Sequence, residues 1–270
     1  KKTMQRIKQI KTTELLGAAE GKSPRHIIAG NGHIFFTTYG GYVAAVDTVN
    51  FKLTAKYKVG SYPEGLAGYA SSIVVANSDY AKGHGNISII NLGTGDVETR
   101  NVEGINNPQK IFINNGNVYI LDWVYYEGEY PNSVEKGESA IKYLAGNKAT
   151  KVTDAYYASM LNGKLYIISN PYAVAKYSVC DLNSNPYQGT TTPLNLSEGV
   201  FSPAGIDVDP ATGEIFVLSY NQGENGYADY YSNGYVKRYS KNGSYMYSYD
   251  TGVGPCAVFF NVGVKTILDN

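Results

Sequence analysis

A short phrase that recurs along the chain constrains its fold more than any other feature. The phrase starts with a proline after a small or polar residue. An apolar alternation, a turn at glycine or asparagine and a second apolar alternation then follow. Its copies, spaced 39 to 52 residues apart, begin at Pro24, Pro63, Pro108, Tyr156 (which lacks the proline), Pro203 and Pro255. A repeat of this length made of strands indicates small β units that bury a continuous core by stacking.

The first two strands of each unit form a predicted hairpin with suitable turn residues. Residues 30–32 and 114–116 supply the glycine and asparagine that a short β-turn with positive φ requires. A proline at the first strand position removes no ladder hydrogen bond. The tip at residues 209–213 fits a type I turn closed by glycine, and it lacks the later ligands of a calcium loop.

Two further strands follow each hairpin, for example at residues 42–47 and 52–59. Four strands per repeat predict an all-β fold, a β-propeller of four-stranded antiparallel blades within a single domain over residues 1–270. The five complete blades are expected at about residues 24–60, 63–104, 108–154, 156–200 and 203–252.

The two ends of the chain are expected to be closing or partial blades. Residues 1–22 would include an outer strand over 2–10 and at most one or two helical turns within 12–19. Residues 255–270 would begin with an inner strand over 256–260. Unmatched ends predict six to seven blades in the complete protein, because open blade edges are a liability.

The composition of the chain argues against several classes of function. The chain carries 23 basic and 23 acidic residues, so its charge does not indicate binding to nucleic acid or to an anionic membrane. No apolar run approaches the length that spans a bilayer. Cys180 and Cys256 lie in apolar, strand-like contexts, which favours two buried free thiols over a disulfide bridge.

The phrases at residues 22–27, 59–67, 89–92 and 203–208 resemble the YncE-like β-propellers exported by Bacteroidetes. The resemblance covers essentially residues 3–260 and includes the order and spacing of the phrases. It implies a seven-bladed protein, entered here within its second blade, on the extracellular face of the outer membrane. The implied lipid anchor lies in a segment absent from this chain. Some members capture cobalamin above a TonB-dependent transporter, so the resemblance implies a corrinoid ligand and such a transporter as partner.

Tyrosines are concentrated where a propeller places its ligand sites. The chain has 26 tyrosines and 8 phenylalanines, and many tyrosines fall between the second and third strands of a repeat. Propeller geometry places those loops on the same face as the loops that precede the first strands, which hold Tyr62 and Tyr156. Tyrosine combines flat apolar area with a hydroxyl at low ordering cost. The predicted ligand-binding residues are Tyr39, Tyr62, Tyr80, Trp123, Tyr125, Tyr126, Tyr172, Tyr220, Tyr230 and Tyr231.

Two classes of function stay open on these residues. The first is a non-catalytic binding propeller without a cofactor, whose ligand is a corrinoid, a glycan or a protein. The second is a calcium-dependent, lactonase-like hydrolase with Glu64, Asn107 and Asp122 at the channel mouth. The three histidines have no metal-binding spacing, and His84 is the one candidate for function among them. The tyrosines could also simply cover the ends of strands.

Overall fold

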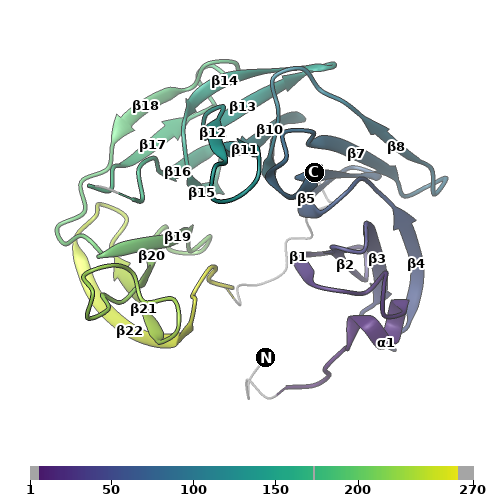
Figure 1. The fold of residues 1–270 in the computed structure, drawn as a ribbon, viewed down its shortest axis with the longest axis horizontal. Coiled ribbons are helices and arrows are strands. Elements are labelled where there is room, and N and C mark those ends of the chain that lie inside the picture. The colour runs from purple at the N-terminus through teal and green to yellow at the C-terminus, as the bar shows by residue number, and fades with distance from the viewer. Residues whose placement is uncertain (1–5, 173, 261–270) are drawn as a thin grey trace. The chain divides into compact units, whose positions relative to one another are not determined.

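The computed structural model describes residues 6–172 and 174–260. The fold is all-β, a five-bladed propeller of four-stranded antiparallel sheets, which confirms the predicted fold class. Figure 1 follows the blades along the chain from β1 to β22. A short helix, α1 (Thr12–Leu16), precedes the first blade. No helix in the described part of the chain is long and apolar enough to cross a membrane.

Each blade is a meander whose strands follow chain order. The strands of the five blades are, in turn, β1 (Pro24–Gly30), β2 (His33–Thr38), β3 (Tyr42–Asp47) and β4 (Leu53–Lys58); β5 (Pro63–Tyr69), β6 (Ser72–Asn77), β7 (Asn86–Asn91) and β8 (Val97–Arg100); β9 (Pro108–Asn114), β10 (Asn117–Asp122), β13 (Ala140–Ala145) and β14 (Lys148–Asp154); β15 (Tyr157–Leu161), β16 (Lys164–Ile168), β17 (Tyr177–Asp181) and β18 (Thr190–Pro193); β19 (Ser202–Val208), β20 (Ile215–Tyr220), β21 (Asn233–Tyr239) and β22 (Tyr245–Val253). A single 3-10 turn, η1 (Asp79–Ala81), lies between β6 and β7.

The described residues divide into two compact units. The first unit contains residues 6–138 and 142–150, with the first two blades and most of the third. The second unit contains residues 139–141, 151–172 and 174–260, with the rest of the third blade and the last two.

Strand β6 shows why the middle strands of the first unit are continuously apolar. Side chains alternate between the two faces of a strand. Ile73 and Val75 belong to one buried cluster, together with residues of the first blade, and Val74 and Ala76 belong to another, together with residues of the third. Because both faces are buried, the strand has no polar alternation until its end.

The second unit is built on the same principle around the fifth blade. Ile206, Val208, Ile215 and Val217 form its buried cluster with Tyr239. The hydroxyl of Tyr239 donates a 2.5 Å hydrogen bond to the carbonyl oxygen of Glu198, so the buried ring leaves no unpaired polar atom.

The repeated proline marks an irregularity in the innermost strand. In four blades the proline pairs with a fully buried polar residue that is the last or next-to-last of the second strand, and the register shifts directly beside that pair. These pairs are Pro24 with Thr38, Pro63 with Asn77, Pro108 with Asp122 and Pro203 with Ser219. In the fourth blade, which lacks the proline, Tyr157 pairs with Ile168 and the ladder is regular. The proline therefore lies at the first or second position of a bulged inner strand.

The ends of the described chain correct two predictions. Residues 6–10 form no strand, and the rest of that predicted outer strand lies outside the described residues. Residues 256–260 also form no strand, although the Val258 N–H donates to the Asp207 carboxylate at 2.7 Å. Both thiols are free, and Cys180 is buried as predicted. Cys256 is exposed, contrary to the prediction, because its segment is not part of a sheet.

The third blade contains a hairpin where a loop was predicted. Strands β11 (Tyr125–Glu127) and β12 (Val134–Lys136) pair antiparallel between β10 and β13. Three residues per strand are too few for a period of two to stand out in the sequence, so the segment had only its tyrosines as a signal.

Glycine at position 65 is required by close packing between inner strands. A β-carbon there would lie 2.7 Å from the carbonyl oxygen of Gln109 and 2.8 Å from the α-carbon of Lys110, both backbone atoms of β9. We predict that Gly65→Ala lowers the free energy of unfolding by about 1–3 kcal/mol, because the backbone must move to relieve the overlap. Urea denaturation measures this change.

Gly199→Ala is the matched control, since a β-carbon at that position meets nothing within 4 Å. Its effect should stay within about 0.5 kcal/mol. Equal stability of the two variants would contradict the proposed packing.

Candidate functional site

Three predicted tyrosines form a contact chain in the first unit, here called the first tyrosine cluster. Tyr39 follows β2, Tyr62 precedes β5 and Tyr80 lies in η1. The ring centroids of Tyr39 and Tyr62 are 5.1 Å apart, and those of Tyr62 and Tyr80 are 5.0 Å apart. These are separations at which aromatic pairs attract one another.

Glu64 anchors Tyr39 of the first tyrosine cluster. Its buried carboxylate accepts hydrogen bonds from the Tyr39 hydroxyl and, at 2.8 Å, from Nε of Arg25. The Arg25 guanidinium also lies 4.9 Å from the centroid of the Tyr39 ring. Burial, together with Glu64, raises the pKa of the Tyr39 hydroxyl, which therefore stays a hydrogen-bond donor.

The loop that presents Tyr80 has an unusual backbone. Asp79, Tyr80 and Ala81 have φ angles of 48°, 57° and 58°, three successive non-glycine residues in the left-handed region. Each such residue costs roughly 1–2 kcal/mol. Ser78 compensates, because its hydroxyl donates to the Tyr62 carbonyl at 3.0 Å and accepts from the Tyr80 N–H at 3.3 Å. Backbone strain held in place by its surroundings is concentrated at functional sites.

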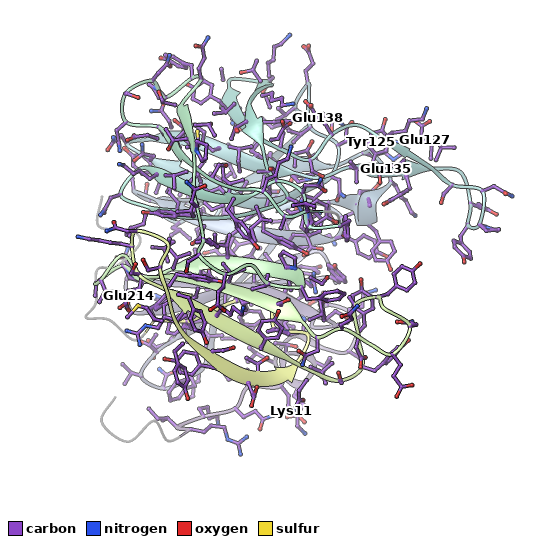
Figure 2. The ribbon with its side chains drawn as sticks, turned by 90° about the vertical axis from the view of Figure 1, so that its left-hand side faces the viewer. Lys11, Tyr125, Glu127, Glu135, Glu138 and Glu214 are labelled. Atoms are coloured by element: carbon purple, nitrogen blue, oxygen red, sulfur yellow. The ribbon has the colours of Figure 1, made fainter. Side chains whose placement is uncertain are left out.

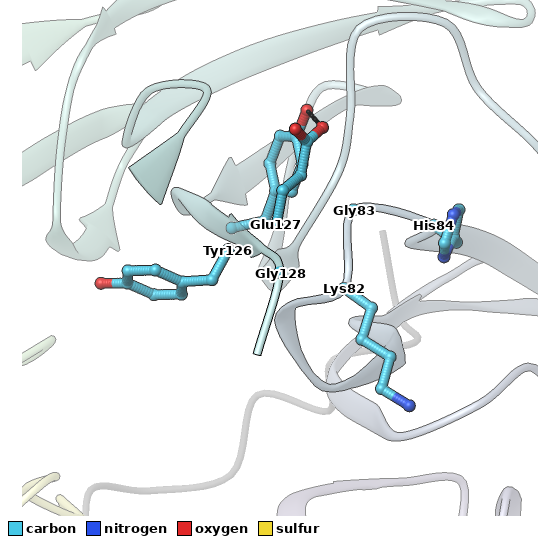
Figure 3. Close-up of a pocket in the computed structure, with 7 residues that line it drawn as sticks. Lys82, Gly83, His84, Tyr126, Glu127 and Gly128 are labelled. Atoms are coloured by element: carbon cyan, nitrogen blue, oxygen red, sulfur yellow. Dashed lines mark hydrogen bonds between the residues drawn. The ribbon is translucent and has the colours of Figure 1, made fainter. Parts of the chain in front are cut away.

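A pocket of about 420 Å³ opens beside this loop. It is lined by Lys82, Gly83, His84, Tyr125, Tyr126, Glu127 and Gly128. Figure 3 shows Lys82 and His84 extending from one wall and Tyr126 and Glu127 from the other. A β-carbon on Gly83 would lie 2.6 Å from the Tyr125 ring, so glycine lets the ring rest on the loop backbone.

Charged groups on the hairpin hold the second wall of this pocket. The Tyr125 hydroxyl lies 3.4 Å from the Glu127 carboxylate, and the Tyr126 hydroxyl donates to Glu135 at 3.2 Å. Lys136 lies 4.0 Å from Glu127. Figure 2 shows Tyr125, Glu127 and Glu135 close together. On the other wall, His84 Nδ1 is 3.4 Å from the Asp79 carboxylate.

A second tyrosine cluster lies in the second unit and consists of Tyr156, Tyr157, Tyr172, Tyr220 and Tyr230. The Tyr156 ring packs against Tyr157 at 5.0 Å and Tyr172 at 5.2 Å, and the hydroxyls of Tyr156 and Tyr172 are 2.6 Å apart. Tyr220 and Tyr230 pack at 4.8 Å. Burial raises the pKa of the Tyr157 hydroxyl, and Tyr172, Tyr220 and Tyr230 add to the shift because they lie nearby.

The structure thus groups most of the predicted ligand-binding residues within the two units. Tyr39, Tyr62 and Tyr80 share the first cluster, Tyr125 and Tyr126 line the pocket, and Tyr172, Tyr220 and Tyr230 share the second cluster. Trp123 is half-buried and its backbone N–H donates to the Asn107 carbonyl, while Tyr231 is 93% exposed. A single face that joins all of them stays a prediction.

Sequence reasoning did not select several residues of these sites. Tyr157 was omitted from the predicted set, although it directly follows Tyr156 at the head of an inner strand. Lys82 and Glu127 of the pocket were not selected either, because isolated charges in loops carry no pattern. The Gly-flanked position of His84 was the available signal on that wall.

The three residues of the hydrolase alternative are all engaged in intramolecular bonds. Asp122 is 0% exposed, pairs with Lys142 at 2.8 Å and accepts the backbone N–H groups of Asn106 and Asn107. The Asn107 amide donates to the Val124 carbonyl at 2.7 Å and accepts from Gln109 at 2.6 Å. In the described ranges no three His, Cys, Asp or Glu side chains are grouped so as to hold a metal ion.

Comparisons with known proteins define the class of the protein, a β-propeller. No protein-family model matches the chain, and a comparison with curated protein sequences found no match. Among solved structures, hydrazine synthase of Kuenenia stuttgartiensis is 14% identical with a TM-score of 0.55 and covers 87% of this chain. This chain spans 65% of that one.

A second solved structure, luciferin-regenerating enzyme, is 13% identical with a TM-score of 0.53, and the match covers 85% of this chain and 76% of that one. Identities this low show a shared fold alone.

We predict that Asp122→Asn lowers the free energy of unfolding by about 3–5 kcal/mol, because it leaves the buried Lys142 ammonium without its counter-ion. Chemical denaturation measures the loss. Asp154→Asn is the control, since its ion pair with Lys151 is exposed and worth at most about 1 kcal/mol. If Asp122→Asn is as mild as the control, the buried pair does not hold this blade.

His26 gives the protein a specific sensitivity to acid. Its ring Nδ1 accepts the Leu66 N–H at 3.4 Å, and burial, aided by Lys110, lowers its pKa from 6.5 to about 4. Between pH 6.5 and about 4, His26 therefore binds a proton in the unfolded chain but not in the folded protein. Stability attributable to His26 is complete above pH 6.5 and is lost as the pH falls toward 4, by about 3 kcal/mol in all.

Asn at this position keeps an acceptor but does not titrate. We predict that His26→Asn loses less stability than the wild-type protein between pH 7 and pH 4, as measured by urea midpoints. Parallel pH profiles for the two proteins would contradict the assignment.

Proposed function

We propose that this chain is a non-catalytic binding propeller that captures a large ligand through its exposed tyrosines, and that the ligand is a corrinoid. The observation that carries the proposal is the second tyrosine cluster. Five rings from three separate segments converge there, and Tyr172 and Tyr230 remain 73% and 56% exposed.

The second tyrosine cluster is prepared for binding before a ligand arrives. Tyr172 is held by the hydroxyl contact with Tyr156 and by the edge-to-face packing of their rings. Side chains that are already ordered lose little entropy on binding. Each aromatic contact with a flat ligand adds about 0.5–1.5 kcal/mol beyond area burial. Several rings together suit a ligand with an extended surface.

The chemistry of the cluster favours an uncharged ligand with polar edges. Its five side chains are all tyrosines, which offer rings and hydroxyls. A corrin macrocycle fringed with amide side chains presents flat apolar area and many hydrogen-bonding groups. A neutral glycan shares that chemistry, which makes it the competing ligand. The resemblance to YncE-like propellers supports the corrinoid, and it supports a TonB-dependent transporter as partner at the outer-membrane surface.

The non-catalytic part of the proposal rests on the intramolecular bonds of three residues in the first unit. Glu64, Asn107 and Asp122, the residues available for a calcium-dependent hydrolase, are committed to Arg25 and Tyr39, to Val124 and Gln109, and to Lys142. Two similar structures are named as enzymes, hydrazine synthase and luciferin-regenerating enzyme. At 13–14% identity their activities are not carried to this chain.

A corrinoid titration followed by calorimetry and absorbance tests the proposal. We predict saturable binding that weakens at least tenfold in Tyr172→Ala and in Tyr230→Ala, since each variant removes an exposed ring from the cluster. Tyr187→Ala, which removes a ring that is 59% exposed elsewhere in the same unit, should bind as the wild-type protein does. Absence of heat and of spectral change with any corrinoid would refute the ligand assignment, and the same variants would then be titrated with neutral glycans.

A further inference from the structure

The outer strand of the fifth blade has an open edge. In the sheet order β22 lies last, and among the described residues no strand pairs with its far side. The strand is nine residues long, and its exposed side chains include Met246, Tyr247 and Tyr249 at 46%, 58% and 41%. An edge that is long, exposed and nearly uncharged is a template for another strand.

The other four outer strands carry the features that normally block such pairing. β4 contains Lys56 and Lys58, and β14 contains Lys148 and Lys151. β8 and β18 are four residues long, and β18 ends in Pro193. β22 has no lysine, arginine or proline, and its one charged residue is Asp250. These differences distinguish β22 from the outer strands of the other four blades.

We propose that β22 pairs antiparallel with β22 of a second copy of this chain. A two-fold axis perpendicular to the joined sheet keeps each side chain on its own face, so facing residues must be separated by an even number of positions. The ladder of β22 with β21 is regular from Tyr247 to Asp250 and irregular on both sides. An axis through Ser248 places the new pairing over Met246 to Asp250, which contains this stretch.

That register is self-complementary. It places Tyr247 opposite Tyr249 of the second copy, and cross-strand aromatic pairs are favourable by roughly 0.2–1 kcal/mol each. Asp250 then faces Met246, so the two strands meet without a like-charge pair. An axis through Asp250 would instead place the two carboxylates opposite one another. This alignment therefore satisfies both charge and aromatic pairing.

The tyrosines of this edge are already ordered. The rings of Tyr247 and Tyr249 contact each other at 4.7 Å. The Tyr249 hydroxyl accepts a 3.3 Å hydrogen bond from Arg238, whose Nη2 and Nε also donate to the two carboxylate oxygens of Glu214 at 2.9 and 3.1 Å. Figure 2 marks Glu214 in this part of the second unit. Ordered side chains lower the entropy cost of association. The short pairing predicts a weak, concentration-dependent dimer.

Sedimentation velocity over a wide dilution series tests the proposal. The wild-type protein should shift from monomer to dimer as concentration rises, and Ser248→Glu should remain a monomer. Ser248 pairs with Lys237 within the monomer, so glutamate there is compatible with the fold, whereas two glutamates would face each other across the axis. Thr192→Glu, on the outer strand β18, should dimerise like the wild type.

Crosslinking tests the register itself. Directly opposed residues of antiparallel strands have α-carbons about 4.5–5.5 Å apart, within the range of a disulfide. In a Cys256→Ser background, which removes the exposed thiol, Ser248→Cys should form a reducible dimer and Thr192→Cys should not. A wild-type protein that stays monomeric throughout, or equal crosslinking of the two cysteine variants, would overturn the proposal. Neither result bears on corrinoid binding, because this inference does not rest on the proposed function.

Discussion

The architecture depends on a buried polar side chain that holds the start of an inner strand against the end of its neighbour. Asp122 is the strongest example, because it joins an ion pair with Lys142 to two backbone N–H groups ahead of β9. Ser219 does the same work for β19 through the backbone of Ser202. The proline that opens the inner strand lacks an N–H, so the polar residue opposite it is free to bind the preceding loop. The repeated proline and the buried polar residue that pairs with it therefore belong to one local structure.

Fixing that junction also fixes the loops that carry the tyrosines. In the second blade the side chain of Asn77 instead binds Asn86 and Ser88, and the next residue, Ser78, binds the carbonyl of Tyr62 through both its N–H and its hydroxyl. This contact sets Tyr62 against Tyr80. The anchored loop ends thus give the tyrosines fixed positions. In the second unit, Tyr156 is tied by its own N–H to the Ile168 carbonyl, which sets its ring beside Tyr172. Rigid loop ends convert a tyrosine-rich composition into ordered aromatic clusters.

The fold could be predicted because proline, turn glycines and alternating apolar residues are local signals. The strands predicted at residues 6–10 and around Cys256 were wrong, because an apolar alternation does not reveal whether a neighbouring strand exists to pair with it. The surroundings of the acidic residues could not be predicted either. Glu64 and Asp122 look available in the sequence, and only the fold shows Arg25, Tyr39 and Lys142 beside them. The positions of the tyrosines in loops were predictable from the sequence. Their grouping within each unit was not, because it depends on contacts between segments that are far apart in the sequence.

The central claim is that the second tyrosine cluster is a ligand site organised by its loops. Amide hydrogen exchange with and without a saturating corrinoid tests it most directly, because exchange reports which segments a ligand orders. The account predicts that protection on binding is concentrated in residues 169–172, 174–176 and 220–232, with the inner strands unchanged. Protection that is absent from these loops, or that appears only elsewhere in the chain, would contradict it.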